Sequence, residues 1–137
     1  MDKKLDLLRR VPLFGGCRQR ELEEIGRLVD EVDVPAGHVL MTQGRTGGEF
    51  FVIVSGTVRV ERDGVRIATL KDGDFLGEIA LVDEGPRSAT VTAETPLRLL
   101  VVGHREFHSL LDRSPTVERS VLTALAKRVR RTEPDLL

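Results

Sequence analysis

Apolar residues follow a helical spacing at both ends of the chain and a strand spacing between them. In residues 3–10, Leu5 and Leu8 share one face of a short predicted helix, and Pro12 ends that pattern. A second helix is predicted over residues 18–29, because apolar residues recur there at helical spacing among charged ones: Leu22, Ile25, Leu28 and Val29. The N-terminal segment is therefore expected to be helical.

The middle of the chain, residues 30–103, changes to alternating apolar and polar positions. Turn-forming residues interrupt it about every ten positions, which is typical of short strands in a sandwich or barrel. Asp63-Gly64 lies between two alternating runs and predicts a hairpin. Residues 50–54 are continuously apolar, so this strand should be buried on both faces. The pattern predicts a mainly β fold, an antiparallel β-roll of the jelly-roll barrel type with flanking helices.

Two further helices are predicted after Gly103. The first covers about residues 104–111, and the second begins after Ser114, which can cap it, with Pro115 in its first position. Basic residues gather near its C-terminal end, where the helix dipole favours them: Lys127, Arg128, Arg130 and Arg131. Its apolar positions form a stripe wide enough to contact both the roll and a second copy of the chain: Val117, Val121, Leu122, Leu125, Ala126 and Val129.

The length of 137 residues and the nearly balanced charge limit the functional classes. We expect a single domain, 1–137, made of N-terminal helices (1–29), the roll (30–103) and two C-terminal helices (104–133). The 21 Lys and Arg against 22 Asp and Glu leave a net charge of −1, so no overall field attracts nucleic acid or an acidic membrane. A single cysteine, and the lack of a signal-like or membrane-spanning run, favour a cytoplasmic protein without membrane contact.

Residues 75–91 contain the candidate functional site. From Arg87 onward the strand period places Arg87 on the same side as Ala89, so the guanidinium should face the apolar interior and needs an anionic partner. Spacing alone leaves two partners open: the Glu78 carboxylate, or a ligand phosphate, which a guanidinium can bind through two hydrogen bonds. Gly77 precedes a short helical run, where backbone N–H groups can approach an anion closely.

The order of residues in this segment resembles the phosphate-binding cassette of cyclic-nucleotide-binding domains, the family of bacterial catabolite activator proteins and cAMP-dependent kinase regulatory subunits. The matching runs are Gly77-Glu78-Ile79-Ala80-Leu81 and Pro86-Arg87-Ser88-Ala89-Thr90-Val91. The resemblance implies that Glu78 accepts the ribose 2′-hydroxyl group and that Arg87 binds the cyclic phosphate. It also implies that backbone N–H groups near three residues complete the phosphate site: Ile79, Ala80 and Ala89.

The resemblance covers nearly the whole chain, including the entry Val11-Pro12-Leu13-Phe14 and the turn glycines at positions 37, 44, 56 and 73. It implies that Val60 and Leu70 line the base or ribose side of the site. The final helix would act as a lid, with Thr132 at the position of a base-contacting threonine. Ser88 resembles the cAMP-responsive bacterial branch but is also able to reach a guanine amino group, so cAMP is the expected ligand and cGMP stays open.

These observations predict a stand-alone cyclic-nucleotide sensor that has no catalytic activity, cofactor or metal. It would signal to an effector protein or domain through the C-terminal helices. Only six residues follow Arg131, so a DNA-reading helix-turn-helix unit does not fit after the last helix, and no direct contact with nucleic acid is expected. The alternative is a structural or protein-interaction module in which Arg87 pairs with Glu78 and no nucleotide enters.

A histidine pair raises a competing metal-site hypothesis. His104 and His108 are one helical turn apart on a predicted helix, a spacing that can hold zinc. The metalloprotease order requires a glutamate directly after the first histidine, where Arg105 stands, and no third ligand is apparent. Metal enzymes of the cupin kind use several histidines on strands, whereas the predicted roll contains only His38, which should lie at the surface. The sequence therefore does not support a metal enzyme.

Overall fold

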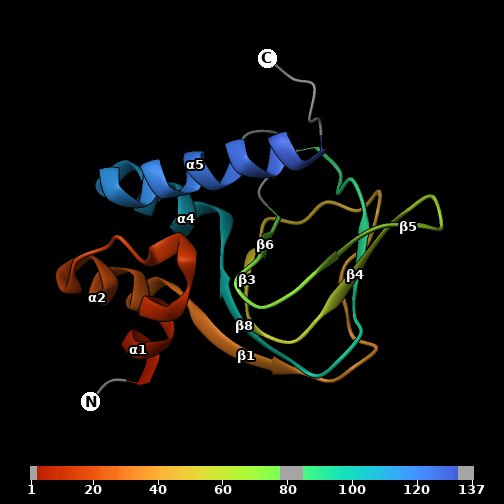
Figure 1. Ribbon diagram of the computed structural model, residues 1–137, viewed down its shortest axis with the longest axis horizontal. Helices are drawn as coiled ribbons and strands as arrows, with labels where there is room; N and C mark the ends of the chain where they lie inside the picture. Colours follow the sequence, from red (N-terminus) through yellow and green to blue (C-terminus); the bar gives the residue numbers. More distant parts are fainter. Residues whose placement is uncertain (1–2, 78–84, 133–137) are drawn as a thin grey trace.

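The computed structural model describes residues 3–77 and 85–132, and for Thr132 only the backbone. The predicted site residues Glu78, Ile79 and Ala80 lie outside the described residues. In the described part, helices gather at one end of the molecule and a β-roll forms the other, with the last helix extending across the roll (Figure 1).

The roll consists of two four-stranded antiparallel sheets, which confirms the predicted fold class. In the first sheet the strand order is β1-β8-β3-β6, and in the second it is β2-β7-β4-β5. The strands of the first sheet are β1 (Asp30–Val34), β3 (Phe50–Ser55), β6 (Phe75–Leu76) and β8 (Leu97–Val102). The strands of the second are β2 (Val39–Met41), β4 (Val58–Arg62), β5 (Val65–Leu70) and β7 (Thr90–Ala93). Neighbours in the sheets are often distant in sequence, as in a jelly-roll topology.

The hairpin predicted at Asp63-Gly64 joins β4 to β5. Both turn residues have positive φ angles, 53° for Asp63 and 79° for Gly64. This is the backbone of a two-residue type I′ turn, whose twist matches that of the two strands. The strand register across the hairpin pairs Arg62 with Val65 and Val58 with Leu70.

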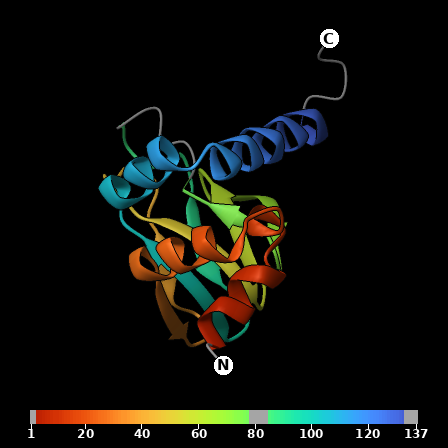
Figure 2. The same cartoon turned by 90° about the vertical axis from the view of Figure 1, so that its left-hand side faces the viewer.

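Helices cover one face of the first sheet (Figure 2). They are α1 (Lys3–Arg10), the 3₁₀ turn η1 (Pro12–Phe14), α2 (Gln19–Leu28), α4 (His104–Arg113) and α5 (Pro115–Thr132). The helix predicted over residues 104–111 continues for two more residues, to Arg113, and Ser114 is its C-terminal cap. Ser114 caps α5 as predicted, since the Val117 backbone N–H donates to the Ser114 hydroxyl oxygen at 3.3 Å. Within the described residues, no helix combines the length and the apolar character needed to cross a bilayer.

Strand β3 separates two apolar clusters, as its uninterrupted apolar sequence predicted. Phe50 and Val52 pack among the helices, whereas Phe51 and Ile53 pack inside the roll. All four are less than 10% exposed, and only Val54 at the end of the run is partly exposed. The roll and the helical layer therefore have separate interiors that share one strand.

The apolar stripe of α5 is only partly used for packing. Val117 and Val121 are buried against the helical cluster, but Leu122 is 60% and Val129 45% exposed. Residues spaced by seven lie on the same side of a helix. Leu122 and Val129 thus form an outward apolar strip on the C-terminal half of α5.

Candidate functional site

Arg87 is the buried charge that the sequence predicted. Only 6% of its side chain is exposed, and Ala89 and Val91 on the same parity are buried as well, whereas Ser88 is exposed. Strand β7 begins at Thr90, so Arg87 lies in the segment just before the strand. The inward direction of the side chain therefore extends upstream of the regular strand.

Backbone hydrogen bonds with a neighbouring loop hold Arg87 in this position. The Arg87 N–H donates to the Arg45 carbonyl oxygen, and the Gly44 N–H donates to the Arg87 carbonyl oxygen, each at 2.9 Å. Next to these bonds, the Gln43 N–H donates to the hydroxyl oxygen of Thr90, the first residue of β7, at 3.0 Å. This loop continues the pairing of β2 with β7 and fixes the backbone on both sides of the arginine.

Among the described residues, Glu49 is a partner of Arg87 that the sequence did not indicate. The Arg87 Nη2 group donates to the Glu49 carbonyl oxygen at 3.0 Å and lies 3.4 Å from the Glu49 carboxylate oxygen Oε2. The distance is long for an ion pair, and the Glu49 side chain is 56% exposed, so solvent screens the interaction from the Glu49 side. Within residues 3–77 and 85–132, the described hydrogen bonds of the guanidinium all come from Nη2.

Two glycines leave space for the guanidinium. A Cβ atom on Gly47 would lie 3.0 Å from both Nε and Nη2 of Arg87. Gly77 has a φ of +92°, and a Cβ there would lie 2.5 Å from the Glu49 carbonyl oxygen and 3.3 Å from Nη1 of Arg87. A side chain at Gly77 is therefore excluded by both backbone conformation and space. Gly77 therefore allows Arg87 and the Glu49 backbone to come close, whereas the predicted approach of an anion to the N–H groups after Gly77 falls on residues outside the described part and stays a prediction.

The remaining predicted residues divide into three groups. Ala89 is buried, and the partly buried Val60 and Leu70 pack against the apolar cluster of the roll. Val60 pairs with Val91, and Leu70 pairs with Val58, so both belong to the sheet that contains β7. Ser88 is exposed, and its carbonyl oxygen accepts a hydrogen bond of 3.0 Å from Arg62 Nε. Thr132 is the last residue of α5.

A contact between α5 and β6 connects the helical layer to this site. The Arg128 guanidinium carbon lies 4.0 Å from the centre of the Phe75 ring, and Arg128 Nη2 donates to the Phe75 carbonyl oxygen at 2.6 Å. Phe75 stacks on Phe50 at 5.7 Å between ring centres, and Phe50 stacks on Phe107 of α4 at 4.3 Å. Phe50 directly follows Glu49, so the aromatic row ends beside the partner of Arg87.

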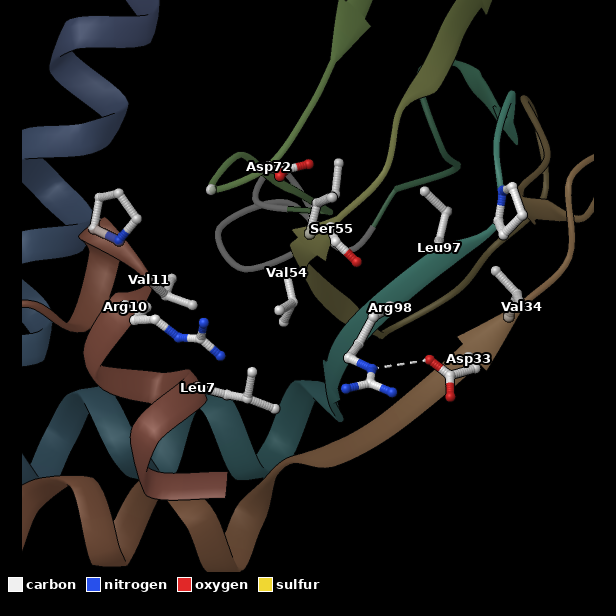
Figure 3. A pocket seen from close by; sticks show the side chains of 14 residues that line it. Leu7, Arg10, Val11, Asp33, Val34, Val54, Ser55, Asp72, Leu97 and Arg98 are labelled. Atoms are coloured by element: carbon white, nitrogen blue, oxygen red, sulfur yellow. Dashed lines mark hydrogen bonds and ion pairs between the residues drawn. The ribbon is translucent and has the colours of Figure 1, made fainter. Parts of the chain in front are cut away.

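A cavity of about 770 Å³ lies outside the roll, between the N-terminal helices and the ends of β1, β3 and β8 (Figure 3). Arg10 and Arg98 enter it from opposite sides. Arg98 is already paired, with the Asp33 carboxylate at 3.1 Å and the Glu31 carboxylate at 3.5 Å, and Asp33 raises its pKa. None of the predicted site residues that the structure describes lines this cavity, which therefore lies apart from Arg87.

The other reactive side chains of the described part do not form a second reactive centre. His104 and His108 contact each other edge to face at 4.5 Å, but no group of three or more potential metal ligands occurs among the described residues. His38 is exposed, as expected. Burial raises the pKa of the Cys17 thiol to about 11, with the charge of Glu21 as a smaller cause, so the nucleophilic thiolate form is disfavoured.

A jelly-roll with a buried arginine, backed by two glycines and followed by helices, defines a small β-roll domain with a cation in its interior. Residues 31–114 match the family model of the cyclic nucleotide-binding domain. Because this match covers more than half of the chain, the protein belongs to the cyclic nucleotide-binding domain family. The resemblance stated from the sequence is thereby confirmed.

Known relatives agree with this family and fold. The CRP-like cAMP-activated global transcriptional regulator of Mycobacterium tuberculosis is 28% identical over 136 residues, or 96% of this chain and 61% of the relative. The cAMP-dependent protein kinase regulatory subunit of Yarrowia lipolytica is 35% identical over 106 residues, or 76% of this chain and 28% of the subunit. The crystal structure of the Thermus thermophilus catabolite activator protein superposes with a TM-score of 0.79 at 30% identity, over 90% of this chain and 61% of that chain.

The chain spans about three fifths of the bacterial relative and just over a quarter of the fungal one. By their names, both relatives are regulators, one of transcription and one of a kinase. The family model itself covers the roll and α4 of this chain.

Proposed function

We propose that the protein is a cyclic-nucleotide sensor that prefers cAMP and carries out no catalysis. The observation that carries the proposal is the buried Arg87 guanidinium, whose described carboxylate partner, Glu49, is largely exposed and lies 3.4 Å away. A buried charge with such a weak partner gains from a second anion that reaches it without water. A cyclic phosphate carries one negative charge and offers the two oxygens that a guanidinium can bind. The names of both relatives support cAMP as this ligand.

The remaining ligand contacts follow from the family resemblance. Glu78 would accept the ribose 2′-hydroxyl group, and backbone N–H groups would reach the phosphate from the segment after Gly77 and from Ala89. Val60 and Leu70 would pack against the base or ribose, and Ser88 and Thr132 would contact the base. We expect cGMP to bind more weakly than cAMP, because Ser88 resembles the serine of the cAMP-responsive bacterial branch.

The signal would pass from the phosphate to α5 through the aromatic row. A phosphate at Arg87 competes with the Glu49 carboxylate, and Glu49 precedes Phe50, which stacks on Phe75. Phe75 in turn holds Arg128 of α5 through its ring and its carbonyl oxygen. A ligand shifts such an equilibrium only by its differential affinity for the two arrangements, typically about 1–3 kcal/mol. The altered position of α4 and α5 would then be read by an effector protein or domain.

We also propose that the outward strip of α5 can pair two copies of the chain. Leu122 and Val129 are exposed apolar residues on one side of the helix. Sedimentation velocity of the wild type and of Leu122→Glu, each with and without cAMP, tests this. If the wild type is a monomer with and without cAMP, the dimer proposal is wrong, and the proposal of nucleotide binding is not affected.

Isothermal titration of the protein with cAMP, cGMP and 5′-AMP tests the proposed function. We expect the tightest binding for cAMP and little for 5′-AMP, whose open phosphate differs in charge and shape. Thermal unfolding provides an independent readout, because ligand at about one hundred times its Kd should stabilise the protein by about 2.7 kcal/mol. If neither cyclic nucleotide gives heat or raises the melting temperature, the sensor function is wrong.

A further inference from the structure

A second groove lies under α5, on the outside of the roll. It has a volume of about 830 Å³ and runs between α5, η1 and the turn that leads into β6. Among the described residues, none that was predicted to contact the nucleotide lines it. The groove is therefore distinct from the site around Arg87.

One wall of this groove is basic, and the described residues form no ion pairs with it. Four residues of α5 form it: Arg119, Lys127, Arg130 and Arg131. All four are exposed, and none makes an ion pair or side-chain hydrogen bond to another residue that the structure describes. A favourable helix dipole explains basic residues in the last turn of α5 but not Arg119, which lies near its start. The wall therefore offers a row of positive charges along the helix that no described residue neutralises by direct contact.

The opposite wall and the floor have different chemistry. Asp72 and Asp74 stand on the turn before β6, and each carboxylate already accepts a backbone hydrogen bond, from Gly56 N–H at 2.8 Å and from Lys71 N–H at 3.0 Å. The floor between the walls is apolar: Pro12, Leu13, Phe75 and Ala124. The groove thus combines a basic wall, an apolar floor and two engaged carboxylates.

We propose that this groove binds a short acidic peptide segment of an effector protein, with an apolar side chain of the segment on the floor. The cations of α5 would pair with its carboxylates, and the floor would gain from covering Pro12 and Ala124, the two floor residues that are not already buried. A nucleic acid fits less well. Base stacking requires an open aromatic face, whereas Arg128 already covers the Phe75 ring.

This proposal adds to the proposed function the chemistry of the partner. Only the regulation of peptide binding by a nucleotide rests on that function. Phe75 contributes to the groove floor and also holds Arg128 of α5. A shift of α5 on nucleotide binding would therefore change the width of the groove. Peptide binding itself requires no nucleotide, so the two proposals can fail separately.

Fluorescence anisotropy at low ionic strength tests the groove. The probe is a short labelled peptide of aspartate and glutamate with a central Leu-Phe pair. Its companions are the same peptide with Ala-Ala at the centre and an oligodeoxythymidylate of equal charge. The test variant carries Arg130→Gln and Arg131→Gln. The control carries Arg27→Gln and Arg113→Gln, which remove two exposed charges from the last turns of α2 and α4, away from the groove.

We expect the Leu-Phe peptide to bind and the test variant to weaken that binding about tenfold, as two exposed ion pairs allow. The control variant should bind like the wild type, and the Ala-Ala peptide should bind more weakly. Equal losses in both variants, equal binding of both peptides, tighter binding of the oligonucleotide, or no binding at all would each overturn the proposal. cAMP titration of the same samples separates the two hypotheses. If the protein binds the peptide as expected but binds no cyclic nucleotide, the groove proposal stands and the proposed sensor function is wrong.

Discussion

Arg128 of α5 lies over the ring of Phe75 in β6 and also donates a hydrogen bond to the Phe75 backbone carbonyl oxygen, at 2.6 Å. This double contact joins the C-terminal half of the last helix to the strand that ends one residue before Gly77. The helix is thus tied to the start of the cassette by one side chain.

Replacing Arg128 by glutamine should loosen this tie. We expect a loss of about 1–2 kcal/mol in the free energy of unfolding, because a cation–π contact and a charge-assisted hydrogen bond disappear together. Urea unfolding followed by circular dichroism measures it. The control is Arg105→Gln on α4, an exposed arginine without an ion pair in the described part, which should change stability by less than about 0.5 kcal/mol. Equal effects of the two substitutions would contradict the importance of the contact.

Arg87→Leu should abolish most of the affinity for cAMP. The expected loss is about 2–5 kcal/mol, because a desolvated charge contact disappears. Calorimetric titration measures it, with Arg45→Leu as the control: this neighbouring arginine is exposed, so its loss should matter little. Arg87→Lys keeps the charge without the planar guanidinium group, so its affinity for cAMP should lie between those of Arg87→Leu and Arg45→Leu. Retention of wild-type affinity by Arg87→Leu would remove Arg87 from the binding site.

Glu49→Gln tests whether the Glu49 carboxylate competes with the ligand. The Arg87–Glu49 ion pair is long and half exposed, so removing its charge should cost little stability and should raise the affinity for cAMP. We expect an increase of up to about fivefold, the equivalent of one exposed ion pair. Titration with cAMP decides the matter. A lower affinity would mean that Glu49 helps to hold Arg87 in its binding position.

Gly77→Ala separates the cost of an unusual backbone angle from the cost of missing space. Gly37 has nearly the same φ, 89° against 92°, but a Cβ there meets nothing within 4 Å. Gly37→Ala should therefore lose about 1–2 kcal/mol from backbone strain alone. Gly77→Ala should lose about 1–3 kcal/mol more, because its Cβ collides with the Glu49 backbone. Denaturant unfolding of both variants compares them, and equal losses would show that the backbone at Glu49 can move aside.

Glu21 should make stability depend on pH in the acidic range. Its carboxylate accepts hydrogen bonds from the Arg18 N–H at 3.0 Å and from the Ser114 hydroxyl at 2.7 Å, and these two contacts, in that order, lower its pKa. A lowered pKa stabilises the fold above the ordinary carboxyl range, and the gain is lost as pH falls through the folded-state pKa.

Glu21→Gln should therefore lower the melting temperature at neutral pH, through a loss of about 0.5–1 kcal/mol. The difference from the wild type should shrink as the pH is lowered. Thermal unfolding over a series of pH values measures this. The exposed Glu23→Gln, on the same helix, is the control. A difference that does not depend on pH would assign the effect to shape rather than charge.

The sequence predicted the fold well because its patterns are local. The change of period near residue 30, the Asp63-Gly64 turn and the Ser114-Pro115 helix start each depend on a few neighbouring residues, and the structure contains all three. The end of α4 and the 3₁₀ turn at Pro12–Phe14 were not predicted, since their bounds are set by packing against other elements.

The site was predictable only in part. The parity rule placed Arg87 inward, and the structure confirms this. Glu49 was missed, because it lies 38 positions away in a loop and reaches Arg87 largely through a backbone oxygen, which leaves no residue signature. The groove under α5 was also missed. The basic residues were visible in the sequence, but the floor that faces them comes from η1 and β6 and forms only on folding.

The separate interiors on the two sides of β3 affect how the molecule can move. Phe50 and Val52 face the helices, while Phe51 and Ile53 keep the roll closed from within. The rearrangement of α4 and α5 that we propose would therefore disturb one face of the strand and leave the other packed. The helices would then move without admitting water to the inside of the roll, and repeated switching would not begin the unfolding of the protein.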